Sequence, residues 1–215
     1  MRAVPVCPRC GAIVRPPSPW SSTWTCAEHG SVAPLHPAGR PGQDALDHLR
    51  RQAARGQLPV WLPWPLPNGW LVSGCTYAGE DRTGAVATVV ALSGPGPLGG
   101  AAEWFLVAES PGVGLGAWLA GLPGPDPGRG FDAGPPHAKV EAAGHPTPLW
   151  GIPGDPGVAA FVGEARAAWL WALLWPASAG VLLLEAHHLV DLVERTDGLD
   201  IPHGALAPHL AALAR

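Results

Sequence analysis

The chain has 215 residues, enough for one sizeable domain and a small accessory module. Apolar residues make up 47% of it and charged residues only 14%, which excludes a disordered, solvating chain. The net charge is −4, yet the first 60 residues carry seven arginines against three acidic side chains, so the remainder is acidic. Because phosphate contacts need clustered Lys and Arg, nucleic acid is not the expected partner, although the basic N-terminal part leaves an opening for it.

The first residues do not have the pattern of a secretory signal. Prolines and cysteines interrupt the sequence MRAVPVCPRC before an apolar run can form. The chain is therefore expected in the cytoplasm, where thiols are kept reduced. Four cysteines in a reducing compartment indicate metal binding rather than disulfides.

Three of these cysteines and one histidine form the pattern C-x2-C-x15-C-x2-H, at Cys7, Cys10, Cys26 and His29. Each pair presents two ligands around one tight turn, so two pairs can hold one ion tetrahedrally. The glycine after each pair, Gly11 or Gly30, supplies the backbone freedom that such a turn often needs. The segment resembles a zinc ribbon with histidine as the fourth ligand. We predict a structural zinc ion here, because four protein ligands leave no position for a catalytic water.

Other interpretations of the cysteines are weaker. A thioredoxin-like redox pair opens a helix after a strand, whereas Pro16, Pro17 and Pro19 follow this pair. A module of about 35 residues cannot bury enough core to fold unaided, and zinc would supply the missing stability. His36 is the alternative fourth ligand, and Cys75 is expected in the core of another element.

The first predicted elements are two short strands around the second ligand pair, over 22–26 and 30–36. A linker rich in Gly and Pro then leads to a helix over 44–55, which Gly56 is expected to end. The apolar stripe of this helix consists of Leu46, Leu49 and Ala53.

Residues 58–70 contain four prolines and three tryptophans. Such a segment can be an extended ligand for another domain, but we expect it to lie rigidly over the core. From Trp70 onward the pattern has period two, and short connections favour antiparallel pairing. The predicted strands are 70–79, 84–92 and 101–109, with weaker candidates at 137–144 and 147–152.

Eighteen uncharged residues lie between Arg166 and Glu185, the length of a transmembrane candidate. However, the turn signal WPASAG interrupts them, and large and small side chains alternate before it. We therefore predict a buried β-hairpin over 167–185 and no membrane span. Residues 186–198 are predicted as a helix that ends at Gly198.

The motif GVGLGA, Gly112 to Ala117, matches the dinucleotide pattern G-x-G-x-x-A. The Gly- and Pro-rich run that follows leaves no room for the helix and parallel strand of that fold. We predict a strand-to-helix turn that binds no dinucleotide. The polar residues at strand ends and in loops, such as Glu103 and Glu164, form no recognised catalytic constellation. Whether the protein is an enzyme is left open, with non-enzymatic function favoured.

Several segments together resemble an uncharacterised actinobacterial family, a domain of unknown function with an N-terminal CPRCG zinc-ribbon-like motif. They are CPRCG, PVWLPWPLPNGW, DRTG, SGPGPLGG, GVGLGA, PTPLW and GEARAAWLWALLWP. The resemblance implies a cytoplasmic bacterial protein. It transfers no activity and no catalytic residue.

The expected fold is α+β, with a mainly antiparallel sheet and a few helices behind a small zinc-ribbon-like module. The expected divisions are 1–38 for the module, 39–57 for a linker and helix, and 58–215 for the α+β domain.

The expected function is that of a zinc-binding interaction or regulatory protein whose module binds a protein partner. The alternative is a small-molecule-binding domain or enzyme with a pocket at the Gly-rich loops. A pocket with converging carboxylates, His or Arg would favour the alternative, and an apolar, Trp-bearing surface beside the ribbon would favour the first.

Overall fold

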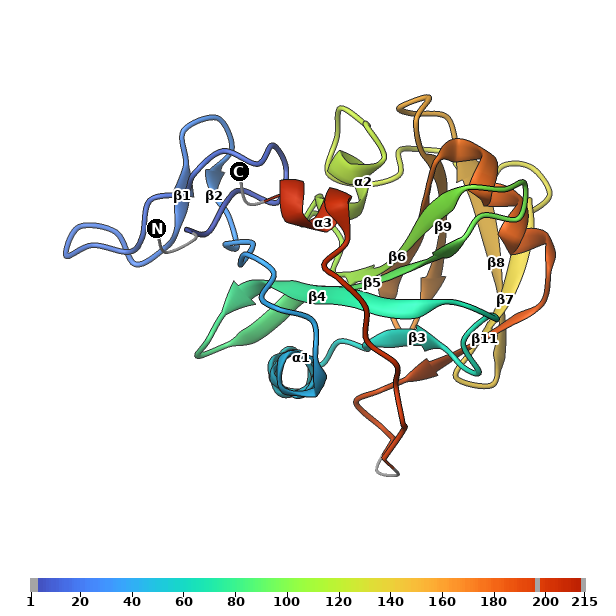
Figure 1. The fold of residues 1–215 in the computed structure, drawn as a ribbon. Helices are drawn as coiled ribbons and strands as arrows, with labels where there is room; N and C mark the ends of the chain where they lie inside the picture. The colour runs from blue at the N-terminus through green and yellow to red at the C-terminus, as the bar shows by residue number, and fades with distance from the viewer. Residues whose placement is uncertain (1–3, 196–197, 214–215) are drawn as a thin grey trace.

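The computed structural model describes residues 4–195 and 198–213. The elements are, in chain order, β1 (Thr25–Cys26), β2 (Gly30–Ser31), α1 (Gln43–Gly56), β3 (Trp61–Pro63), β4 (Leu71–Glu80), β5 (Gly84–Pro95), β6 (Ala101–Glu109), α2 (Leu115–Leu119), β7 (Ala138–Ala142), β8 (His145–Ile152), β9 (Ala159–Ala165), β10 (Ala168–Trp175), the 3-10 helix η1 (Ala177–Leu184), β11 (His187–Asp191) and α3 (Pro208–Ala212). The strands β1 and β2 form a two-stranded sheet near the N-terminus, and the other nine strands form one large sheet (Figure 1).

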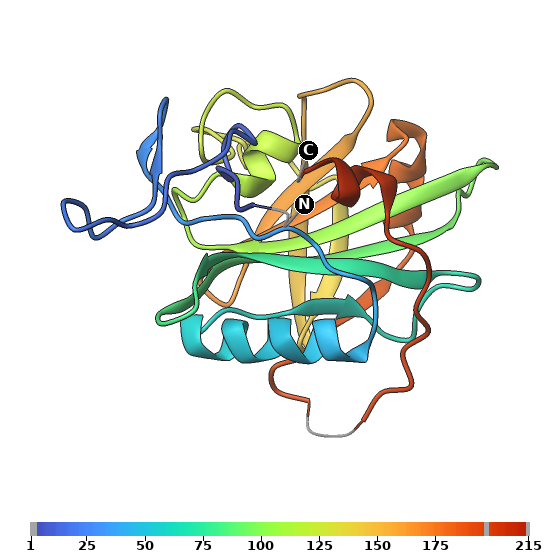
Figure 2. The same cartoon turned by 60° about the vertical axis from the view of Figure 1, so that its left-hand side comes forward.

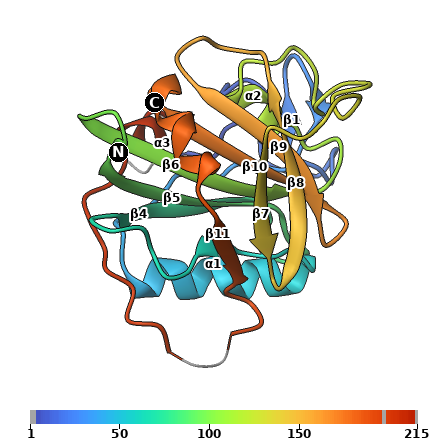
Figure 3. The same ribbon diagram turned by 90° about the vertical axis from the view of Figure 1, so that its right-hand side faces the viewer.

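The large sheet has the order β3-β11-β7-β8-β9-β10-β6-β5-β4. All neighbours are antiparallel except β11 and β7, which are parallel and lie side by side in Figure 3. The sheet curls, so that α1 lies below both edge strands, β3 and β4, in Figure 2. These features confirm the expected α+β fold with a mainly antiparallel sheet and few helices.

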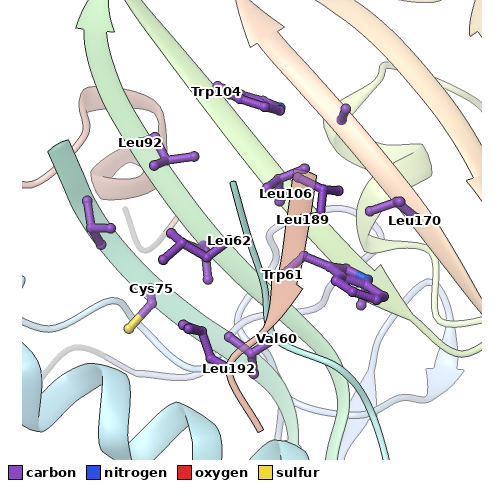
Figure 4. Close-up of a cluster of buried hydrophobic side chains, with 14 of the residues drawn as sticks. Val60, Trp61, Leu62, Cys75, Leu92, Trp104, Leu106, Leu170, Leu189 and Leu192 are labelled. Atoms are coloured by element: carbon purple, nitrogen blue, oxygen red, sulfur yellow. The ribbon is translucent and has the colours of Figure 1, made fainter. Parts of the chain in front are cut away.

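The strands β4, β5, β6 and β10 are buried on both faces, which explains why they are apolar along most of their length. Successive strand side chains point to opposite faces. Trp104 and Leu106 of β6 therefore enter an inner core with Trp61 (Figure 4). Phe105 and Val107 enter an outer core on the opposite face. The outer core also contains Val6 and Leu35 of the N-terminal segment, together with α2 and α3. The division of the chain at residues 38 and 57 stays a prediction.

The helix α1 agrees with its prediction, and Leu46, Leu49 and Ala53 are all buried. Gly56 has a different role from the one expected. It is the last helical residue, and Gln57 provides the left-handed cap with a φ of 57°. A Cβ atom on Gly56 would lie 1.8 Å from the carbonyl oxygen of Ala85, so glycine permits the close approach of α1 to β5.

The predicted hairpin over 167–185 is wrong in its second half. The first strand exists as β10, but its two edges pair with β9 and β6. The chain after Pro176 therefore finds no free edge on β10 and forms η1 instead. Strand β9, which pairs with one of these two edges, was not predicted. Within the described residues, no helix is long and apolar enough to cross a membrane.

The predicted helix over 186–198 is also wrong in its described part. His187, Leu189 and Asp191 are buried in alternation, and β11 fills the space between β3 and β7. Residues 196–197 of that prediction lie outside the described residues.

The segment 58–70 lies against the core as expected, and it also supplies β3, the edge strand next to β11. The short helix α3 was not predicted either.

Candidate metal centre

The ligand atoms of Cys7, Cys10, Cys26 and His29 all lie within 4.8 Å of one another. The Nδ1 atom of His29 is 3.6 Å from the sulfur of Cys7 and 3.7 Å from that of Cys26. The sulfurs of Cys10 and Cys26 are 3.8 Å apart. Tetrahedral zinc with its ordinary bond lengths places two sulfurs about 3.8 Å apart and a sulfur and a nitrogen about 3.6 Å apart. These three separations match that geometry, and the four side chains lie close enough together to hold one metal ion.

The first ligand pair is held by a tight turn. The backbone N–H of Gly11 donates to the carbonyl oxygen of Cys7 at 2.9 Å, and the N–H of Arg9 donates to the Cys7 sulfur at 3.4 Å. Gly11 has a φ of 70°, a conformation that favours glycine. This bears out the role that the sequence suggests for the glycine after the pair.

The second pair repeats this geometry within the two-stranded sheet. Cys26 on β1 is the register partner of Gly30 on β2, and Gly30 has a φ of 66°. The predicted strands are thus present but short, with β1 limited to two residues and β2 to two. Each ligand pair is thus followed by a left-handed glycine, and the two turns bring their four ligand atoms within 4.8 Å of one another.

The environment of the sulfurs gives them unequal acidity. Burial raises the pKa of Cys7 to about 12. Burial would also raise the pKa of Cys26, but the backbone N–H groups of Glu28 and His29 donate to its sulfur and lower that pKa to about 6. The lowered pKa favours the thiolate of Cys26, the form that binds metal. Binding of an ion would release protons from the other thiols.

The alternative ligands lie elsewhere. The ring of His36 stacks on Tyr77 with a centroid separation of 4.4 Å, and its Nε2 lies 2.9 Å from the carbonyl oxygen of Gly79. Cys75 is buried in the inner core, as expected, and burial raises its pKa to about 12. Neither side chain belongs to the cluster around His29.

The first turn also contacts the GVGLGA loop. Arg9 donates from Nε to the carbonyl oxygen of Val113 at 3.1 Å and from a terminal nitrogen to that of Gly112. On the other side of the turn, a Cβ atom on Gly11 would lie 2.9 Å from the indole of Trp118 in α2. The candidate metal centre and the large sheet therefore meet at this loop.

The GVGLGA loop is a turn from β6 into α2, as predicted. The N–H groups of Leu115 and Gly116 donate to the carboxylate of Glu109 at 2.8 and 3.2 Å. The N–H of Gly112 donates to Asp126 at 2.8 Å. Because these N–H groups already have internal carboxylate acceptors, they are not free for a phosphate. The absence of dinucleotide binding stays a prediction, now with this physical reason.

The other polar candidates form two separate groups. Arg166 contacts Asp191 at 3.2 Å and also Glu194, on one rim of the sheet. Glu103 lies 2.8 Å from the Nδ1 of His209, a residue that sequence reasoning did not single out. Since 106 positions separate these two residues, no local pattern could have found the pair.

The fold and the cluster define an α+β protein with a curled, mostly antiparallel sheet and an N-terminal group of residues able to hold a metal ion. The chain belongs to a family of unknown function, DUF6758, whose model matches residues 1–210. A search of curated proteins and a search of solved structures each found no match. The actinobacterial origin implied by the sequence resemblance stays a prediction.

Proposed function

We propose that Cys7, Cys10, Cys26 and His29 bind one zinc ion with a structural role. Three soft sulfurs and one imidazole nitrogen in tetrahedral spacing are a donor set typical of zinc. All four positions are protein side chains, so the ion has no open site for a substrate. The four cysteines of the chain are free thiols, which agrees with the cytoplasmic location that we also propose.

The need for an ion follows from the size of the local core. The hydrophobic cluster around the site consists of Cys7, Val14 and Cys26, with Cys10, Trp24 and Val32 partly buried against it. Half of these residues are the ligands themselves. So small a core does not hold two turns together without metal, whose binding is worth about 10–16 kcal/mol in small zinc peptides.

We infer that the zinc-held segment serves to bind a protein partner. The observation that carries this inference is Trp20, whose exposed fraction is 95%. It lies in a tight turn between Ser18 and Ser21, which exchange backbone hydrogen bonds of 2.8 and 3.1 Å. This loop extends away from the rest of the molecule at the far left of Figure 1. Exposed tryptophan is enriched where proteins bind one another.

The base of the loop connects it to the metal. Arg15 and Thr25 exchange backbone hydrogen bonds of 2.9 and 3.0 Å, and the residue after Thr25 is the ligand Cys26. Zinc would thus hold the base in place, and Trp20 would be presented without a large loss of conformational entropy on binding. Arg15 is exposed and adds a positive charge at the base of the loop.

Two measurements test this function. Elemental analysis of protein purified without added metal should find about one zinc per chain, and Cys10→Ser should lose it while Cys75→Ala retains it.

A photo-crosslinking residue at position 20 should then form a discrete product with one partner protein in cells, and Cys10→Ser should abolish this product. The matched control is position 98, because Leu98 is also highly exposed, at 73%. Equal products from both positions, or a product that survives loss of zinc, would contradict the proposal.

A further inference from the structure

A cavity of about 460 Å³ lies at the end of the sheet beside the Gly-rich loop that joins β5 and β6. Its polar lining consists of Ser93, Glu103 and His209, and Trp175 forms part of its wall. The remaining lining residues are glycines, alanines and prolines. The volume is within the range of small-molecule sites.

Three neighbouring strands build the floor of this cavity. Glu103 on β6 is the direct register partner of Ser93 on β5 and of Trp175 on β10. Directly opposed residues point to the same face of a sheet, so these three side chains stand in one row. The short helix α3 covers the row and brings His209 onto it.

Glu103 and His209 form a tightly held pair. One carboxylate oxygen of Glu103 lies 2.8 Å from the Nδ1 of His209, and the other accepts the backbone N–H of the same residue at 3.2 Å. The imidazole stacks on Trp175 with a centroid separation of 4.7 Å and an angle of 20°. The ring is therefore fixed in place although about half of the His209 side chain is exposed.

The hydrogen bonds determine what the pair offers to a ligand. A neutral ring whose Nδ1–H donates to the carboxylate presents a lone pair at Nε2. The hydroxyl of Ser93 donates to that of Ser73 at 2.7 Å, so its oxygen also faces the cavity as an acceptor. The polar groups of the cavity are thus acceptors, and the described lining contains one carboxylate and no lysine or arginine.

We propose that this cavity binds a small protonated amine with an apolar body. The ammonium group would donate to the acceptors around Glu103 and balance its charge, while the apolar body would lie against Trp175 and the prolines. A neutral alcohol supplies only one donor and no charge, and an anion would meet the carboxylate. A small-molecule pocket at the Gly-rich loops is the alternative function expected from the sequence, and this proposal corresponds to it. It does not depend on the proposed role of the Trp20 loop.

The test compares three probes of similar shape by isothermal titration calorimetry at pH 8. They are 2-phenylethylamine, which is protonated at this pH, 2-phenylethanol and 3-phenylpropionate. We expect the amine to bind at least tenfold more tightly than the alcohol and the anion to bind least. Glu103→Gln should weaken the amine at least tenfold and leave the alcohol unchanged. Glu141→Gln, at a partly exposed carboxylate that pairs with His188, is the control and should change nothing.

Glu103 also holds α3, so Glu103→Gln could impair folding. For this reason Ala101→Leu, which narrows the cavity and leaves the Glu103–His209 pair intact, should weaken the amine and the alcohol together, with an unchanged Tm. Tightest binding of the alcohol or the anion would overturn the proposal. The proposal would also be overturned if the amine showed no binding up to about 10 mM, the dissociation constant of a weak fragment. Amine binding that Ala101→Leu leaves unchanged would overturn it as well.

Discussion

Arg9, which lies inside the first ligand turn, donates from its Nε to the carbonyl oxygen of Val113 at 3.1 Å, across 104 positions of the chain. A second hydrogen bond reaches Gly112, so one guanidinium engages two consecutive carbonyl groups of the GVGLGA loop. The side chain of Glu109 holds the N–H groups on the helical side of the same loop. The loop therefore joins the candidate metal centre to the large sheet, and its carbonyl and N–H groups make these contacts.

Replacement of Arg9 by alanine should weaken this junction. Removing a charged donor leaves two carbonyl groups without it, and each such bond contributes about 1–2 kcal/mol. We expect the free energy of unfolding to fall by roughly 2 kcal/mol in urea denaturation. Arg15→Ala, at an exposed arginine of the same segment, should cost less than about 0.5 kcal/mol. Equal effects of the two substitutions would show that Arg9 does not hold the junction.

The buried carboxylate of Glu109 should make stability depend on pH. Burial raises its pKa to about 7, although its two N–H donors act in the opposite direction. The folded state therefore retains a proton that the unfolded chain releases near pH 4.3. Relative to Glu109→Gln, the wild-type protein should lose roughly 2–4 kcal/mol of stability as pH rises from about 4.5 to about 7. Urea denaturation of both proteins across this range measures the difference, and a difference that is constant with pH would contradict the prediction.

A side chain at position 56 should destabilise the protein. An alanine Cβ at this position would lie 1.8 Å from the carbonyl oxygen of Ala85, so α1 or β5 must move. We expect Gly56→Ala to cost about 2–3 kcal/mol, as overpacking does elsewhere, and to lower the Tm. Gly39→Ala is the matched control, because nothing lies within 4 Å of the Cβ added there. If both variants have the same Tm as the wild-type protein, the close approach of α1 and β5 does not require glycine at position 56.

Dinucleotides should not bind to the GVGLGA loop. The N–H groups that would hold a pyrophosphate already donate to Glu109 and Asp126. Calorimetry with NAD, NADP and ATP should detect no binding tighter than about 100 µM, a weak affinity of about −5.5 kcal/mol. Tighter binding that Gly114→Val abolishes would reverse this interpretation and make the loop a nucleotide site.

Short-range features of this protein were determined by the sequence itself. A ligand turn is closed by residues that are consecutive in the chain, so the pairs Cys7–Cys10 and Cys26–His29 could be identified from their spacing. The same holds for α1 and for β4, β5 and β6, whose periodicity repeats over enough residues to define one structure.

Tertiary structure decided the features that depend on free sheet edges. Residues 187–191 have apolar spacing that also suits a helix, but β3 and β7 leave a place for a strand there. Residues 177–184 are apolar enough for a strand, but both edges of β10 are already paired. Likewise, the pairs Glu103–His209 and Arg9–Val113 join positions more than a hundred residues apart. Such contacts arise only when the sheet has placed its strands, because no local pattern specifies which distant segment will lie beside a given residue.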